Sequence, residues 1–426
     1  MIVAYTIYNI LVALLGKRSY GSWFNPVSLY SLVWEIAVGL HESKLITFYE
    51  LSGYTWFIIF LMQTLFVVSC FAGIHSKLVI GNFRPTSSNE VDNKELKKQI
   101  KKYIIITTSV ASIAIFTSLY GTISRFGTQL LSNLTSIYAA RVYNQETAKT
   151  IPYIGSFLYI ALPLCGIYLK RFGFSFLAVP PFVLAFLDAL NSGGRAGIVF
   201  SMILFVSAYY ITDMNASTGK KPIAKRRKVF MYIGVAIFAV MIIVISIQRN
   251  AGQNLTYATP AFEKIFGNNL LVYKTMTYIA GPIGVLNEYL KTSELHFGQN
   301  TFLTVFNLLN KLGIGERVEQ YQEWFYTPLP CNVGTFIREL IEDFTVVGAA
   351  ISVLIFGYAT SRSYMNAKKD YNTRSKVMWA ILSLVLLLSF FDWKLRSSNI
   401  WIALLFGFII CSQIDRKARI NRRVEL

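Results

Sequence analysis

The sequence is poor in charge for its length. Asp, Glu, Lys and Arg make up 15% of its 426 residues, whereas a typical soluble domain holds about 25%. A soluble chain of this length would fold into two or three domains with polar surfaces, and this composition cannot cover them. Hydrophobic residues reach 54% and the mean hydropathy is +0.47. The composition therefore indicates a membrane protein.

Histidine and cysteine are scarce as well. The chain has 3 His and 4 Cys. Three of the cysteines fall in apolar blocks and only Cys331 falls in a long connection, so neither a disulfide framework nor a metal cluster is expected. The histidines are scattered and no pair of carboxylates has ligand spacing, so the sequence predicts no metal site.

The apolar residues gather in blocks of roughly 15 to 22, the length with which a helix crosses about 30 Å of hydrocarbon. The blocks run continuously without period-two alternation, which favours helices over a membrane barrel. We therefore predict an all-α, polytopic transmembrane bundle of about 11 helices (roughly 10 to 12) with a long, partly helical outer loop. Helices are expected at residues 2–16, 26–41, 54–75, 103–123, 151–169, 172–190, 195–213, 229–248, 343–361, 377–391 and 398–414.

Lys and Arg gather in alternate connections between these blocks, and the net charge is +19. Lys and Arg are retained on the cytoplasmic side during insertion. The basic connections and the C-terminus are therefore expected in the cytoplasm, where they contact anionic lipids rather than nucleic acid. The basic set comprises Lys17–Arg18, 76–102, Lys170–Arg171, 220–228, 362–376 and 415–426.

This alternation divides the chain into helices within 1–248, an extracytoplasmic segment 249–342 and further helices within 343–426. The middle segment is far longer than a simple connection, and its many Phe, Tyr, Leu and Ile residues predict that it folds. Leu270–Leu290 is apolar enough to suggest another crossing. Lys274 and a break at Gly281–Pro282 instead favour a helix that lies at the membrane interface.

Two arginines flank predicted helices on the outer side. Arg195 follows a tight turn in which Gly193 and Gly194 allow close approach to a ligand. It stands at a helix N-terminus, which favours an anion. Arg249 lies where the next helix leaves the membrane. A plain interfacial position is the alternative for Arg195, and a plain ion pair is the alternative for Arg249.

A third arginine, Arg338, lies where the long segment returns to the membrane. The forked guanidinium matches phosphate oxygens, so a cluster of the three arginines would suit a pyrophosphate. An ion pair of Arg338 with Glu339 or Glu342 is the alternative. His296 is the one histidine of the long segment, and histidine titrates near neutrality, so it could accept a proton from a hydroxyl. A structural histidine is the alternative.

Two acids inside predicted helices, Glu35 and Asp188, are the features that favour a proton-coupled transporter. Neither has a basic partner inside the bilayer in the sequence pattern. The pair Pro180–Pro181 is expected to kink the helix predicted at 172–190.

Several short stretches, in their order and on their expected side of the membrane, resemble a known family. These are Ser192–Gly197 at the head of a helix, Gln248–Arg249 at the end of the next, Asn332-x-x-Thr335, and Asp343-Phe344-x-x-x-Gly348 opening a helix. The pattern resembles the Wzy-type O-antigen and capsular polysaccharide polymerases, the oligosaccharide repeat-unit polymerases.

The resemblance implies a glycosyltransferase of the bacterial cytoplasmic (inner) membrane that uses neither metal, cofactor nor nucleotide sugar. Such enzymes transfer a glycan from undecaprenyl pyrophosphate to an acceptor hydroxyl on another lipid-linked repeat unit. The product is a surface polysaccharide, either capsule or the O-antigen of lipopolysaccharide. Chain length often depends on a separate regulator protein. The related O-antigen ligases, and a polysaccharide flippase or transporter, are the alternative functions.

The resemblance and the residues together give a set of expected site residues. The arginines would hold the donor pyrophosphate, and His296 or a carboxylate such as Glu339 or Asp343 would deprotonate the acceptor. Catalysis is expected from His296, Arg195, Arg249, Arg338 and Asp343, and substrate binding from Asn191, Gly194, Asn300, Asn332, Thr335 and Glu339.

Overall fold

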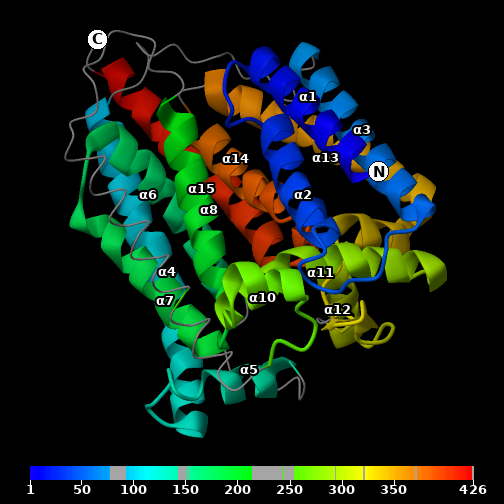
Figure 1. Cartoon of the computed structure of the whole chain (residues 1–426). Coiled ribbons are helices and arrows are strands. Elements are labelled where there is room, and N and C mark those ends of the chain that lie inside the picture. The colour runs from blue at the N-terminus through cyan, green and yellow to red at the C-terminus, as the bar shows by residue number, and fades with distance from the viewer. Residues whose placement is uncertain are drawn as a thin grey trace. The chain divides into compact units, whose positions relative to one another are not determined.

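A computed structural model describes residues 1–76, 93–142, 151, 153–213, 243, 254–292, 294–319, 322–369 and 372–424 (Figure 1). Within these residues the fold is all-α apart from one short hairpin, as predicted. Among the described residues, five helices are long and apolar enough to cross a membrane, which agrees with a membrane protein. They are Gly53–His75, Asn93–Phe126, Ile154–Phe172, Phe336–Lys368 and Ser398–Arg419. The number of crossings and their orientation stay predictions.

The chain forms two compact units, each made of segments that are distant in sequence. Unit 1 comprises Met1–Lys77, Gly252–Arg362 and Val385–Ser398, and unit 2 comprises Leu78–Ala251, Ser363–Leu384 and Asn399–Leu426. The predicted division at 248 and 342 follows chain order and is a different partition, which stays a prediction.

Unit 1 contains α1 (Ile2–Tyr20), α2 (Pro26–Glu42), α3 (Gly53–His75) and the first part of α13 (Phe336–Lys369). Side-chain caps define the helix starts. Asn25 accepts the Ser28 N–H at 2.9 Å before α2, and Ser52 accepts the Thr55 N–H at 3.1 Å before α3. Trp34 of α2 is fully buried and packs edge-on against Phe336 of α13. These helices therefore share one aromatic core.

Residues 254–342 also belong to unit 1 and hold α10 (Pro260–Phe266), α11 (Leu270–Thr292), α12 (Leu303–Lys311) and the hairpin β1 (Phe325–Tyr326) and β2 (Pro330–Cys331). In Figure 1, α11 lies across the lower end of α2. Its Asn287 accepts the Ser52 N–H at 2.9 Å and the Thr55 hydroxyl at 2.8 Å. The break expected at Gly281–Pro282 is wrong, because Pro282 lies inside a continuous helix. The helix therefore tolerates the loss of the one backbone hydrogen bond that Pro282 cannot donate.

The helix predicted from residue 343 starts earlier, at Phe336, and is interrupted at Thr345. Thr345 has φ 64° and ψ 177°, so its backbone leaves the helical region. A helical carbonyl at position 342 would ordinarily accept the N–H of residue 346. Here the Glu342 carbonyl accepts the His296 N–H at 2.7 Å. The interruption therefore gives the 294–302 segment a backbone attachment point.

Unit 2 holds α4 (Asn93–Phe126), α5 (Leu134–Val142), α6 (Leu158–Phe172), α7 (Val179–Ser192), α8 (Ala196–Asp213), α14 (Thr373–Leu387) and α15 (Ser398–Val424). The end of α13, from Ser363, belongs to unit 2, and the end of α14, from Val385, belongs to unit 1. The helix predicted at 229–248 lies outside the described residues. The kink expected at Pro180–Pro181 is wrong, because both prolines stand in the first turn of α7, where a missing N–H breaks no helical bond.

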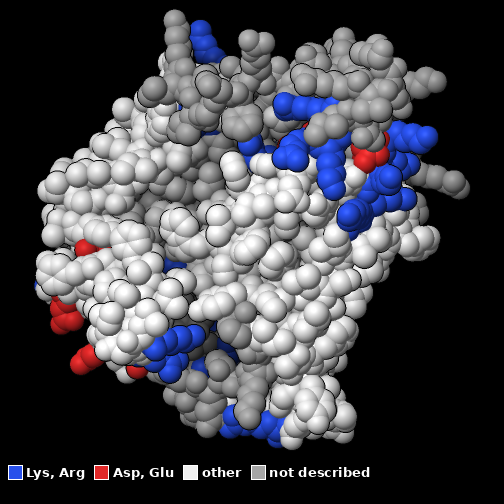
Figure 2. Space-filling view, turned by 180° about the vertical axis from the view of Figure 1, so that it is seen from behind, with Lys and Arg blue, Asp and Glu red and all other residues white. Residues whose placement is uncertain are grey.

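The basic ends of the helices in unit 2 meet at one end of that unit. The Asp415 carboxylate near the end of α15 accepts the Thr373 and Arg374 N–H groups at 2.8 and 3.0 Å, where α14 begins. In the first half of α4, Lys101 lies over the Tyr168 ring near the end of α6. Figure 2 shows Lys and Arg side chains gathered in groups on the face it presents, with largely uncharged surface beside them. Such a surface is what contact with hydrocarbon requires.

Candidate functional site

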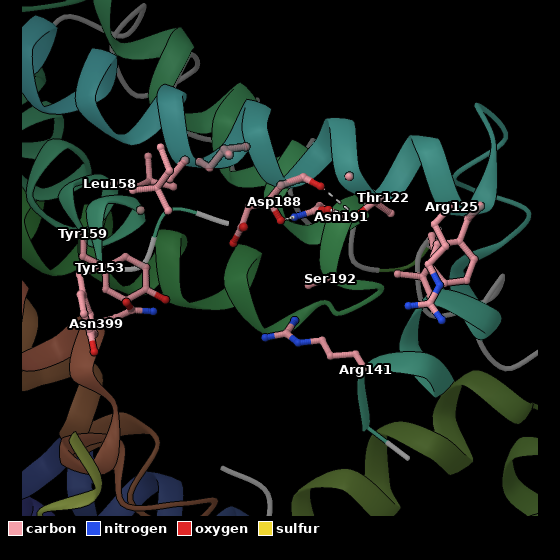
Figure 3. A pocket seen from close by; sticks show the side chains of 18 residues that line it. Thr122, Arg125, Arg141, Tyr153, Leu158, Tyr159, Asp188, Asn191, Ser192 and Asn399 are labelled. Carbon is pink, nitrogen blue, oxygen red and sulfur yellow. Dashed lines mark hydrogen bonds between the residues drawn. The ribbon is translucent and has the colours of Figure 1, made fainter. Parts of the chain in front are cut away.

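A cavity of about 260 Å³ opens in unit 2 where the opposite ends of these helices meet (Figure 3). Its walls come from the end of α4, from α5, from the start of α6, from the end of α7 and from the start of α15. The lining residues are Ala114, Ile115, Ser118, Gly121, Thr122, Arg125, Phe126, Ile137, Arg141, Ile151, Tyr153, Gly155, Leu158, Tyr159, Asp188, Asn191, Ser192 and Asn399. Apart from Ala114, Ile115 and Ser118 within α4, they stand at helix ends or connections that the charge pattern assigns to the outer side.

The charged lining residues come from three different helices. Arg125 ends α4, Arg141 lies near the end of α5, and Asp188 is the one carboxylate among the described lining residues. In Figure 3 the Asp188 carboxylate and the Arg141 guanidinium point toward the same space from opposite sides. Arg141 also attracts Asp188 electrostatically, and the Tyr159 hydroxyl interacts electrostatically with both residues. The cavity thus offers groups that can bind an anion and one that can accept a proton.

Asn191 fixes the wall that carries Asp188. Its amide nitrogen donates to the Ser118 hydroxyl at 2.5 Å, and its amide oxygen accepts a hydrogen bond from Thr122. Both partners belong to α4, so Asn191 fastens the end of α7 to α4. Asp188 lies three positions earlier, on the same face of α7. Asn191 was predicted to bind substrate, and the structure places it in the cavity wall with its amide in these two bonds.

Gly193 ends α7 with φ 61°, a left-handed conformation that L side chains rarely adopt. A Cβ there would lie 2.8 Å from the Leu134 carbonyl oxygen and 2.9 Å from the Tyr138 nitrogen. The close approach expected from this glycine is therefore to the backbone of α5. Gly194 donates its N–H to the Ala189 carbonyl at 3.1 Å and has no comparable crowding.

The predicted grouping of three arginines stays a prediction. Arg195 directly precedes α8, its carbonyl accepts the Val199 N–H at 3.3 Å, and it is not among the described lining residues of the cavity. Arg249 lies outside the described residues. Arg338 belongs to unit 1. Among the described residues, the arginines that line the cavity are Arg125 and Arg141.

Arg338 takes part in a buried network. Its Nη2 and Nε lie 2.6 and 3.0 Å from Oε1 of Glu342, and its Nη1 donates to Gln322 at 3.0 Å. The guanidinium carbon also lies 4.7 Å from the centre of the Phe325 ring. The ion pair with Glu342, one of the two alternatives that the sequence left open, is therefore present.

The other predicted carboxylates belong to the same part of α13. Asp343 accepts the N–H groups of Asn300 and Thr301 at 2.9 and 2.6 Å. Glu339 accepts the Trp393 N–H at 2.9 Å and pairs with Arg396 at 3.1 Å. The predicted residues Arg338, Glu339, Asp343 and Asn300 are thus brought together, and their contacts join α13 to the 296–302 and 392–397 segments.

The remaining predicted residues frame this network. Thr335 caps α13, with its hydroxyl accepting the Arg338 N–H at 3.2 Å. Asn332 stands half-buried between β2 and α13. The His296 backbone N–H binds the Glu342 carbonyl, and its side chain is half-buried. These residues all lie in unit 1, whereas the cavity belongs to unit 2.

Sequence reasoning assigned no role in the site to Arg125 or Arg141. A signal was present, because both lie in the 124–150 connection on the side where Lys and Arg are otherwise sparse. Asp188 was noticed as an acid within a helix, but its position on the cavity wall depends on the packing of α4 against α7. Spacing along the chain does not give that packing.

Comparisons with known proteins found no relative. No family model matches the sequence, and neither the curated proteins nor the solved structures yield a match.

Proposed function

We propose that this protein polymerises undecaprenyl-pyrophosphate-linked oligosaccharide repeat units into surface polysaccharide at the outer face of the cytoplasmic membrane. The observation that supports this proposal is the cavity of unit 2, in which Arg141 faces Asp188 and Arg125 also lines the wall. Both arginines and Asp188 lie near helix ends opposite the basic ends, and basic ends are retained in the cytoplasm.

The chemistry of the cavity suits this transfer. A guanidinium binds phosphate oxygens in a bidentate way and stabilises the charge that develops on a departing pyrophosphate. Asp188 accepts the proton of the acceptor hydroxyl as that oxygen attacks the anomeric carbon. The bond from this carbon to the pyrophosphate oxygen breaks, and undecaprenyl pyrophosphate leaves with its electron pair. The glycan is then one repeat unit longer.

The size of the cavity also bears on the proposal. Its volume of about 260 Å³ is just below the usual range for ligand pockets, about 300–1,000 Å³. It suits a diphosphate and the adjoining part of one sugar rather than a whole repeat unit. The remaining sugars would extend outward, and the polyprenyl chain would lie in the bilayer beside the helices.

Deletion of the gene followed by gel analysis of surface polysaccharide tests the proposal. We expect single repeat units in place of a ladder, restored by the wild-type gene and not by Arg141→Ala. Arg416→Ala, an exposed residue near the basic end of α15, is the matched control and should restore the ladder. An unchanged ladder in the deletion strain would refute the proposal, and complete loss of surface polysaccharide would favour a flippase.

A reaction with purified components separates polymerase from ligase. The purified protein, given lipid-linked repeat units and no lipid A core, should form dimers and longer oligomers of the repeat. A protein that transfers glycan only when lipid A core is added would be a ligase.

A further inference from the structure

A second polar cluster lies in unit 1, between α1, α2 and α3. Its centre is Glu35, midway along α2. The Thr6 hydroxyl donates to Oε1 of Glu35 at 2.7 Å, and the Asn9 amide donates to Oε2 at 2.9 Å. Gln63, near the middle of the membrane-length helix α3, donates in turn to the Asn9 amide oxygen. Three helices thus direct polar side chains to one place at the depth of the middle of α3.

Both oxygens of Glu35 accept hydrogen bonds from neutral donors, as an ionised carboxylate does. Within the described part of the chain, neither Lys nor Arg forms an ion pair with it. The first basic residue of α1 is Lys17, eight positions beyond Asn9, which is about 12 Å along a helix. The helix α3 holds neither Lys nor Arg. An uncompensated carboxylate at this depth costs several kcal/mol, so a positive charge is missing from the cluster.

The cluster also contains buried oxygens that lack partners. The Tyr5 hydroxyl and the Gln63 amide oxygen are fully buried, and neither makes a hydrogen bond of good geometry with a described residue, although the hydroxyl lies within reach of the Asn9 and Gln63 amides. The Tyr5 hydroxyl lies beside Asn9, Gln63 and Glu35. Ser31, one turn before Glu35 on the same face of α2, has a buried and unpaired hydroxyl as well. Buried polar atoms in native proteins nearly always have partners, so these unused lone pairs indicate a bound species.

We propose that this cluster binds a monovalent metal cation of the size of sodium, held by the Glu35 carboxylate and by the oxygens of Tyr5 and Gln63. One carboxylate charge calls for one positive charge. A hard cation coordinates several oxygens at once. It would therefore use the lone pairs of Tyr5 and Gln63 that accept no hydrogen bond. A proton on Glu35 would neutralise its charge but would leave the unpaired oxygens of Tyr5 and Gln63 without a partner. The cation therefore accounts for more of the observed geometry.

Thermal unfolding of the purified full-length protein tests this proposal. The Tm is measured in NaCl, KCl and choline chloride at constant ionic strength. We expect Na⁺ to raise the Tm saturably, by at least about 3 °C over choline, because the ion binds only the folded state. Glu35→Gln keeps the shape of the side chain and should abolish this response. Glu50→Gln, whose side chain is 93% exposed, is the matched control and should respond as the wild type does.

A second variant covers the case in which Glu35→Gln does not fold. Tyr5→Phe removes only the unpaired hydroxyl, and it should require roughly tenfold more Na⁺ for the half-maximal rise in Tm. Binding of radioactive Na⁺ should saturate at about one ion per chain. The proposal is overturned if Na⁺ stabilises the wild type no more than choline does. It is also overturned if the Tm follows pH through Glu35 without any dependence on Na⁺, since the carboxylate then takes a proton. Neither result bears on the proposed polymerase function.

Discussion

Arg338 and Glu342 form an ion pair one helical turn apart in α13, with Nη2 2.6 Å from Oε1 and side chains only 1% and 3% exposed. Removing one partner of such a pair leaves an uncompensated buried charge. We expect Arg338→Ala to lower the free energy of unfolding by about 3–5 kcal/mol, seen as a lower Tm in detergent and a smaller yield of folded protein.

A double variant separates this structural role from binding of substrate. Arg338→Met combined with Glu342→Leu removes both charges, and the Tm should recover most of the loss because apolar replacements of buried pairs are often neutral. If Arg338→Ala instead kept the wild-type Tm and lost the polysaccharide ladder, Arg338 would act on the substrate.

Asp188→Asn should stop polymerisation without unfolding the protein. The amide has nearly the same shape but cannot take the acceptor's proton, and loss of a general base lowers rates by about 10²–10⁴-fold. The rate of chain extension from purified lipid-linked repeats measures the effect, and the Tm is the control for folding. If Asp188→Asn kept its rate and His296→Gln lost it, the base would be His296.

Gly193 and Gly194 offer a matched pair of substitutions in one turn. Gly193→Ala places a Cβ 2.8 Å from the Leu134 carbonyl oxygen at a positive φ, and should destabilise the packing of α5 by about 1–3 kcal/mol. Gly194→Ala meets only Ser192 atoms, none closer than 3.4 Å, and should change the Tm little. Equal Tm values for the two variants would show that α5 does not pack on this turn.

The Cys331 thiol should react slowly with alkylating reagents. Burial raises the pKa of Cys331, although the positive charge of the nearby Arg338 opposes part of the rise. Since the thiolate is the nucleophile, less of it is present at pH 8 than in a free thiol, and the rate should increase as the pH rises further. Mass spectrometry of the iodoacetamide adduct, compared with glutathione, measures this. A rate at pH 8 equal to that of glutathione contradicts it, and Cys331→Ser identifies the adduct.

Much of the helical framework could be predicted from the sequence, because the length of each apolar block and the basic residues that follow it are local features of the chain. α8 begins within one residue of the prediction and α15 begins where expected. The errors have local causes that involve proline and backbone geometry. Pro180 and Pro181 start a helix that they were expected to kink. Pro282 was expected to break a helix that continues through it, and the interruption at Thr345 has no proline or glycine to signal it.

The candidate site was less predictable because it depends on packing. The charge pattern places Arg141 and Asp188 on one side of the membrane, but only the hydrogen bonds of Asn191 to α4 define the wall between them. Conversely, Arg338 and Glu342 have the spacing of a helical ion pair. The sequence could not decide between this pair and a ligand, because burial follows from the segments that cover α13.

The interruption of α13 at Thr345 has a practical consequence for engineering. A β-branched residue at positive φ carries strain of about 1–3 kcal/mol, so Thr345→Gly should relax the backbone while keeping the bend. Straightening the helix would return the Glu342 carbonyl to its own ladder and release the peptide around His296. Variants designed for a more rigid protein should therefore keep this bend.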